Sequence, residues 1–119
     1  MTSVRRAVGR YGERVAERHL LQQGLTLVAR NWRCRAGEVD LILREGDDVV
    51  FCEVKTRRSA TFGAPAEAIR ADKVARLRRL AGFWLAESGA HPREIRFDVV
   101  EVRPQRRGAS RVEHTRAAF

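Results

Sequence analysis

The sequence is poor in the residues that build zinc sites and disulfide frameworks. Its 119 residues include only two cysteines, Cys34 and Cys52, and three scattered histidines. Structural zinc sites need about four clustered Cys or His ligands, so we expect no zinc. Cys52 alternates onto the apolar face of an expected strand and is expected to pack as a small hydrophobic residue. The cysteine content therefore predicts a reduced protein.

Long apolar runs are also absent. No stretch approaches the roughly 18 consecutive apolar residues that a membrane span needs. The opening residues Met1–Arg6 lack the apolar core of a signal peptide. We therefore expect a cytoplasmic protein with no membrane partner.

Lysine is nearly missing from a strongly basic chain. Lysine and arginine number 24 against 15 acidic residues, a net charge of +9, yet only Lys55 and Lys73 are lysines. This charge predicts a polyanionic partner, nucleic acid first, although an arginine-biased soluble surface is the alternative. Where arginine is the rule, Lys55 indicates a need for an ammonium group that can give up its proton. Lys73 lies on an expected helix, where a phosphate contact and simple surface charge are the two interpretations, and we favour surface charge.

Length and hydrophobic content predict one folded domain over residues 1–119, since 44% of the residues are hydrophobic. Apolar periodicity predicts three helices, at residues 4–23, 65–69 and 71–87. Alternation predicts four strands and an edge strand, at residues 26–33, 37–42, 49–55, 94–102 and 111–115. The main order is α-β-β-β-α-β, an α/β fold with a mixed central sheet flanked by helices. Its helical crossover favours parallel pairing of the last long strand with a central one.

Residues 37–55 carry the most informative pattern. Two alternating segments, 37–42 and 49–55, flank an acidic turn at 45–48 and predict a β-hairpin. If the loop has two or four residues, the numbers of paired residues sum to 93. Asp40 then lies opposite Glu53 and Glu38 lies opposite Lys55, with all four side chains on one face.

Two opposed carboxylates in a hairpin repel each other and need a reason, which a divalent cation supplies. Asp40, Glu53 and Lys55 follow the order Asp, Glu-x-Lys of the PD-(D/E)xK nucleases. In such a site Asp40, Glu53 and the Val54 carbonyl hold Mg²⁺ or Mn²⁺, and Lys55 positions or deprotonates the attacking water. The alternative is a cross-strand salt-bridge ladder, which explains Glu38 with Lys55 but leaves Asp40 against Glu53 unexplained.

Glu13 is a further candidate for this site. It lies at the edge of the apolar arc of the first helix, next to Gly12 and one turn after Gly9. Each glycine inside a helix costs about 1 kcal/mol relative to alanine, which indicates close approach to another backbone. The alternative is a surface glutamate paired with Arg10 or Arg14.

Basic residues flank the predicted site on both sides. They are expected to contact a phosphate backbone without reading sequence, and they are Arg30, Arg33, Arg35, Arg57 and Arg58. Solvated surface charge is the alternative for each of them. Asp98 alternates against its apolar neighbours, and we expect it to pair an arginine or bind a loop rather than to take part in catalysis.

Several motifs together resemble a known family: 9–13 (GRYGE), 30–33 (RNWR), 37–42 (GEVDLI), 50–57 (VFCEVKTR), 62–63 (FG), Lys73, 96–100 (RFDVV) and the final Ala118-Phe119. They are similar to the bacterial YraN-like proteins. The resemblance implies a restriction-endonuclease-like fold, related to archaeal Holliday-junction resolvases. It also implies that Glu13, Asp40, Glu53 and Lys55 form the site. Val39 stands where the superfamily pattern has proline, a position that contributes no ligand.

We therefore expect a nuclease that uses Mg²⁺ or Mn²⁺ on DNA phosphodiester bonds, including branched DNA. The alternatives are a non-catalytic nucleic-acid-binding module, an RNA nuclease with the same site, and a protein-interaction scaffold. Junction-cleaving enzymes act as dimers, so a homodimer is a further expectation, with Phe62, Trp32 or the C-terminal residues 117–119 as contacts.

Overall fold

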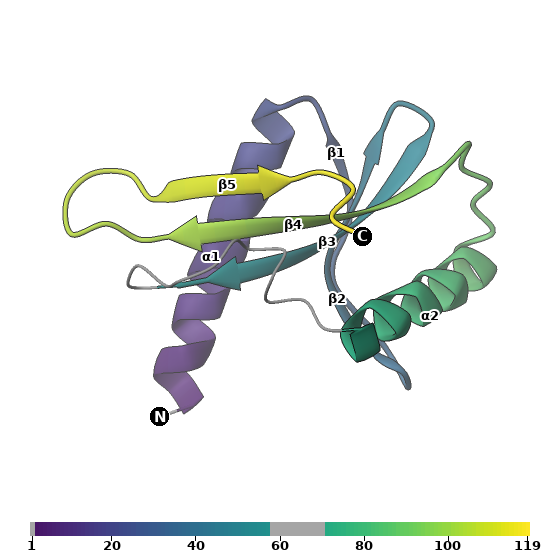
Figure 1. The fold of residues 1–119 in the computed structure, drawn as a ribbon, viewed down its shortest axis with the longest axis horizontal. Coiled ribbons are helices and arrows are strands. Elements are labelled where there is room, and N and C mark those ends of the chain that lie inside the picture. The colour runs from purple at the N-terminus through teal and green to yellow at the C-terminus, as the bar shows by residue number, and fades with distance from the viewer. Residues whose placement is uncertain (1, 58–70) are drawn as a thin grey trace.

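The computed structural model describes residues 2–57 and 71–119. Two helices and five strands follow each other along the chain, with bounds α1 Thr2–Gln22, β1 Thr26–Cys34, β2 Gly37–Glu45, β3 Asp48–Thr56, α2 Ala71–Ser88, β4 Ile95–Arg103 and β5 Arg111–Thr115 (Figure 1). The predicted helices and strands in the described ranges are confirmed within a few residues. The expected short helix at 65–69 lies outside the described residues.

The strands form one mixed sheet in the order β1-β2-β3-β4-β5. Only β3 and β4 pair in parallel, which confirms the predicted pairing across the crossover that contains α2. The other neighbours are antiparallel. The protein is thus an α/β domain in which β3 occupies the centre of the sheet.

The helices cover opposite faces of this sheet, which is why three consecutive residues of β2, 41–43, are all buried. One apolar cluster joins α1 to the sheet through residues such as Ala16, Leu20 and Val50. The other joins α2 to it through Leu80, Trp84, Phe51 and their neighbours. Because helices cover both faces of this sheet, we look for a functional site at the ends of its strands.

The β2–β3 hairpin has the predicted register over part of its length. Its pairs run from Glu45–Asp48 to Leu41–Cys52, and their numbers sum to 93. Gly46, with φ of 62°, supplies the left-handed conformation of the two-residue turn. The ladder ends one step before the expected Asp40–Glu53 pair. Beyond that point β3 continues along β4 as far as Thr56–Val102.

The expected pairing of Glu38 with Lys55 is wrong. The β2–β3 ladder ends at Leu41–Cys52, before it reaches Glu38. On the other edge of β2, Glu38 pairs with Arg33 of β1, and its carboxylate lies 3.3 Å from the Arg33 guanidinium. The reason lies at Asp40, whose Oδ2 accepts a hydrogen bond of 2.8 Å from the Val54 amide. A side chain thereby takes the place of a backbone partner, and the two strands separate there.

The C-terminus folds back onto the sheet. The Ala118 amide donates to the Phe97 carbonyl at 2.8 Å, and the Phe119 ring stacks on Phe97 with 5.6 Å between centroids. Trp32 likewise bonds within the chain, to Glu87 at 3.0 Å. The C-terminal residues and Trp32, which were expected to contact a second copy, thus have partners within their own chain. The homodimer stays a prediction. Neither helix in the described ranges is long and apolar enough to cross a membrane.

Candidate functional site

Asp40 stands where β2 leaves β3, and this position sets its ionisation. Burial raises the pKa of its carboxyl group to about 6, against the hydrogen bond from the Val54 amide, which lowers it. The negative charges of Glu13, Glu53 and Glu38 raise it further. Four carboxylates from α1, β2 and β3 therefore share one electrostatic neighbourhood. The expected nearness of Asp40 and Glu53 holds, although they are not a ladder pair.

Glu53 is the least satisfied group of this neighbourhood. Only 13% of its side chain is exposed, and its Oε1 lies 2.9 Å from the Lys73 ammonium. Its Oε2 is buried and has no hydrogen-bond partner within the described part of the chain. A buried oxygen without a partner costs about 1–3 kcal/mol, so this atom is open to a further partner.

Lys73 belongs to the site, which corrects its interpretation as surface charge. It lies in the first turn of α2, and its contact with Glu53 brings the second helix to the sheet end where Asp40 lies. The signal that could have found it was present in the sequence: Lys55 and Lys73 are the only lysines beside 22 arginines. The rarity of lysine made Lys55 a candidate site residue, and the same argument holds for Lys73.

Lys55 follows Glu53 by two residues on β3 and is half-buried. Burial lowers the pKa of its ammonium group, and the neighbouring Lys73 lowers it further, while Glu53 and Asp40 oppose the shift. A lysine next to a second cation gives up its proton more easily. The charges of both carboxylates thus act on an ammonium group whose pKa is lowered, and a role of Lys55 in catalysis stays a prediction.

Glu13 reaches this neighbourhood because α1 comes very close to β3 at Gly12. A Cβ atom at Gly12 would lie 2.9 Å from Thr56 Cβ and nearer still to its hydroxyl. The expected close approach is thus confirmed for Gly12. It is wrong for Gly9 as far as the described residues go, because a Cβ there would meet none of their atoms within 4 Å.

Asn31 on β1 is a site residue that sequence reasoning missed. Its amide donates to Glu13 Oε1 at 3.1 Å, so Glu13 bonds the sheet rather than the surface arginines considered as alternative partners. Its φ of 46° lies in the left-handed region, which asparagine tolerates better than most residues. Backbone conformations of this kind collect at functional sites.

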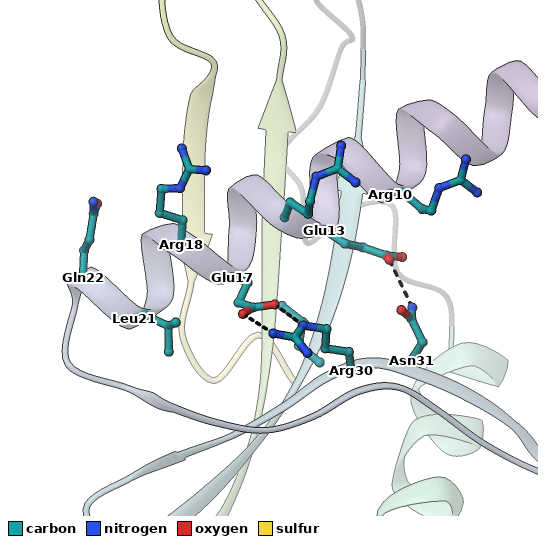
Figure 2. Close-up of a pocket in the computed structure, with 10 residues that line it drawn as sticks. Arg10, Glu13, Glu17, Arg18, Leu21, Gln22, Arg30 and Asn31 are labelled. Carbon is teal, nitrogen blue, oxygen red and sulfur yellow. Dashed lines mark hydrogen bonds and ion pairs between the residues drawn. The ribbon is translucent and has the colours of Figure 1, made fainter.

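A cavity of about 750 Å³ opens beside these residues, between α1 and β1. Figure 2 shows Glu13 and Glu17 on the side of α1 that faces β1, with Asn31 and Arg30 reaching toward them. Arg30 binds Glu17 through two hydrogen bonds of 2.7 and 3.0 Å. The cavity wall is therefore held by specific contacts between the helix and the edge strand.

The arginines expected to meet phosphate have different surroundings. Arg30 is occupied by Glu17, and Arg33 lies 3.3 Å from Glu38. Arg35 is exposed, as expected for a phosphate contact. Arg57 lies 2.9 Å from the buried Glu101, which gives it a structural partner. Arg58 falls outside the described residues.

The donor set can be tested against the predicted metal. Among residues 2–57 and 71–119, no three His, Cys, Asp or Glu side chains gather closely enough to hold a metal ion. Mg²⁺ is usually bound by one or two carboxylates, together with waters and substrate phosphates. Asp40 and the unsatisfied Glu53 are two such oxygen donors, so the residues fit Mg²⁺ or Mn²⁺ and do not fit a metal that needs a full cage of protein ligands.

A second pair of buried acids, Asp98 and Glu101, lies on β4. Asp98 accepts hydrogen bonds from Arg96, His114 and the Ala117 amide, which confirms its expected structural role. Burial raises the pKa of Asp98, but the bonds from His114 and Arg96 outweigh it and hold the pKa below its usual value. Glu101 forms ion pairs with Arg57 at 2.9 Å and Arg103 at 2.6 Å, although its Oε2, like Glu53 Oε2, accepts no hydrogen bond within the described residues. Both acids of this pair therefore face guanidinium groups.

Comparisons place this chain among proteins of similar length. A family model described as "Uncharacterised protein family UPF0102" matches residues 12–102, a range that contains Glu13, Asp40, Glu53 and Lys55. A UPF0102 protein of Beutenbergia cavernae is 60% identical over 110 residues, covering 92% of this chain and 93% of the relative. One of Nocardioides sp. is 54% identical over 114 residues, covering 96% and 92%. One of Frankia alni is 57% identical over 113 residues, covering 95% and 94%.

Proposed function

The chain belongs to the family UPF0102, the YraN-like proteins that its motifs resemble, and from this premise and the site geometry we propose that it is a metal-dependent nuclease acting on DNA phosphodiester bonds. The proposal includes a restriction-endonuclease-like arrangement of the site. It carries with it the expectation of branched DNA as a substrate and of a homodimer that cuts two strands.

One observation carries the proposal. Glu53 Oε2 is buried without a hydrogen-bond partner in the described residues, as Glu101 Oε2 is. Glu53, however, acts on an Asp40 carboxyl group whose pKa is raised to about 6, whereas Glu101 Oε2 faces the Arg57 guanidinium at 2.9 Å. Such an arrangement destabilises the fold unless a cation joins it. A salt-bridge ladder would have satisfied both carboxylates and supports the proposal less well.

Asp40 and Glu53 would hold Mg²⁺ or Mn²⁺, which when bound polarises the scissile phosphate and lowers the pKa of a coordinated water. Lys55 lies beside both carboxylates, and its lowered pKa suits it to position or deprotonate a water. Lys73 holds Glu53 Oε1 and so orients that carboxylate. Asn31 fixes Glu13 at the cavity beside them.

A non-catalytic binding module is the rival reading. It would keep the basic surface but gives no reason for an Asp40 carboxyl group whose pKa is raised by burial and by three neighbouring acids. An RNA nuclease would use the same residues and is separated from a DNA enzyme by the substrate alone.

The test is a cleavage assay with Mg²⁺ and Mn²⁺ on single-stranded, duplex and four-way-junction DNA and on RNA. Asp40→Asn should lower cleavage about 10³-fold, since it removes one ligand carboxylate at the reacting centre. Asp47→Asn, an exposed acid in the β2–β3 turn, is the matched control and should cleave as the wild type does. Absence of cleavage of any substrate by the wild type, or equal cleavage by Asp40→Asn, contradicts the proposal.

A further inference from the structure

Three arginines form a stripe along α1 at the cavity between this helix and β1. Arg10, Arg14 and Arg18 follow each other at intervals of four residues, and all three are exposed. Residues four apart lie on one side of a helix, and eight residues span about 12 Å. Figure 2 shows Arg10 and Arg18 extending from α1 at the cavity, with Arg18 pointing away from β1. We call Arg10, Arg14 and Arg18 the α1 stripe.

The arginines of the α1 stripe form no ion pairs with neighbouring acids in the described residues. Glu13 and Glu17 lie on the same helix, but they face β1 and bind Asn31 and Arg30. Elsewhere in the protein exposed arginines hold carboxylates, as Arg93 holds Asp48 at 3.0 Å. No ion pair of the stripe occurs in the part of the chain that the structure describes. Three positive charges are thus left in one row.

The α1 stripe also has a fixed relation to the carboxylates. All its members line the cavity together with Glu13. The charge of Glu13 acts on Asp40, so the cavity lies next to the Asp40 neighbourhood. Close packing of Gly12 against Thr56 holds this part of α1 on β3, one residue after Lys55. A chain bound along the stripe would lead directly to the site.

The cavity lining indicates what kind of chain this is. The ten residues that line it are charged, amide or aliphatic, and none of these ten is aromatic. Proteins that bind single strands through their bases use aromatic stacking platforms. A row of guanidinium groups without such platforms is suited to phosphates, which arginine binds with paired N–H donors.

We propose that the α1 stripe binds the phosphodiester backbone of one nucleic-acid strand and guides it to Asp40 and Glu53. This inference rests on the proposed nuclease function and deepens it. Neighbouring members of the stripe lie about 6 Å apart along the helix, so the three guanidinium groups can meet about three phosphates of one strand. Contacts of this kind position the substrate and carry no sequence preference.

The experiment measures binding of a labelled DNA duplex over a series of salt concentrations, with EDTA present so that no cleavage occurs. The full-length triple variant Arg10→Ala/Arg14→Ala/Arg18→Ala is compared with Arg44→Ala/Arg93→Ala/Arg116→Ala. The control removes the same charge around the β2–β3 turn, where Arg93 and Arg116 hold Asp48 and Glu45. The single variant Arg14→Ala, which changes one exposed side chain, accompanies them in case the triple variant fails to fold.

The logarithm of the binding constant falls linearly as the logarithm of the salt concentration rises, and each phosphate contact makes this slope steeper by about 0.9. The magnitude of this slope should therefore decrease by about 2–3 in the stripe variant. It should decrease by about 1 in Arg14→Ala and by less than about 1 in the control. Equal losses in stripe and control variants would overturn the stripe while leaving the nuclease proposal intact. Absence of salt-dependent binding by the wild type would overturn both. Cleavage lost in Asp40→Asn but normal in the stripe variant at low and high salt would also exclude the stripe.

Discussion

Two pairs of buried acids lie on neighbouring strands of the same sheet, and their surroundings are opposite. Asp98 and Glu101 on β4 are 0% and 1% exposed, and guanidinium groups of Arg96, Arg57 and Arg103 hold them. Asp40 and Glu53 are less buried, yet Asp40 has three acidic neighbours. One oxygen of Glu53 and one of Glu101 lack a hydrogen-bond partner in the described residues, so the two pairs differ in the charge that surrounds them. The more deeply buried pair is the one neutralised by guanidinium groups.

The difference shows that burial alone does not mark a functional acid. The pKa of Asp98 is lowered because hydrogen bonds outweigh burial, whereas the pKa of Asp40 is raised because burial and like charges outweigh its one amide bond. A lowered pKa stabilises the fold when the group is ionised, and a raised one destabilises it. The β4 pair therefore serves the fold, and the Asp40–Glu53 pair weakens it in a way that a ligand can reverse.

The largest expected effect comes from breaking the satisfied pair. Asp98→Ala leaves Arg96 and His114 without their shared carboxylate at a buried position. Loss of one partner from a buried charge network costs about 3–5 kcal/mol, which chemical denaturation near neutral pH measures. Stability of the variant within about 0.5 kcal/mol of the wild type contradicts a structural role for Asp98.

Asp40→Asn should change the free energy of unfolding in the opposite direction and stabilise the protein. The folded-state pKa of about 6 lies above the ordinary 3.8, so wild-type stability from this group falls as pH rises between these values. In EDTA near neutral pH the variant should be more stable than the wild type by about 1–3 kcal/mol. The difference should vanish below about pH 4, where Asp40 is protonated in both states.

The exposed Asp47→Asn variant is the control for this pH series, and its stability should follow the wild type throughout. A less stable Asp40→Asn protein near neutral pH would show that Asp40 is satisfied in the fold after all, and the contrast with Asp98 would be lost.

Sequence reasoning predicted the hairpin register because strand side chains alternate strictly, and this was enough to bring Asp40 and Glu53 together. It placed Glu38 wrongly because the ladder is ended by a side-chain bond, Asp40 to the Val54 amide, that no alternation pattern contains. Lys73 and Asn31 were missed for a different reason. Each reaches the site from another element, and local periodicity carries no information on such approaches.

Lys73→Met sharpens the contrast by removing the cation that holds Glu53 Oε1. Both side chains are partly exposed, at 22% and 13%, so solvent screens the loss and we expect a destabilisation of about 1–2 kcal/mol in EDTA. Arg79→Met, an exposed basic residue of the same helix, should stay within about 0.5 kcal/mol of the wild type. Equal stabilities of the two variants would contradict a site role for Lys73.

The smallest effect is expected at the helix that presents Glu13. Gly12→Ala gains about 1 kcal/mol in helix propensity but overpacks against Thr56, with a net cost of about 1 kcal/mol. Gly9→Ala has free space and should stabilise by about 0.5–1 kcal/mol. Thermal unfolding measures the melting temperatures of both variants against the wild type. Shifts of both melting temperatures in the same direction would contradict close packing of α1 on β3.

The central claim is that Asp40 and Glu53 form an incomplete site that a divalent cation completes. Calorimetric titration of Mn²⁺ into the wild type, Asp40→Asn and Asp47→Asn tests it without a substrate. We expect saturable binding to the wild type and to Asp47→Asn, and none to Asp40→Asn. No binding to the wild type, or undiminished binding to Asp40→Asn, would contradict the account.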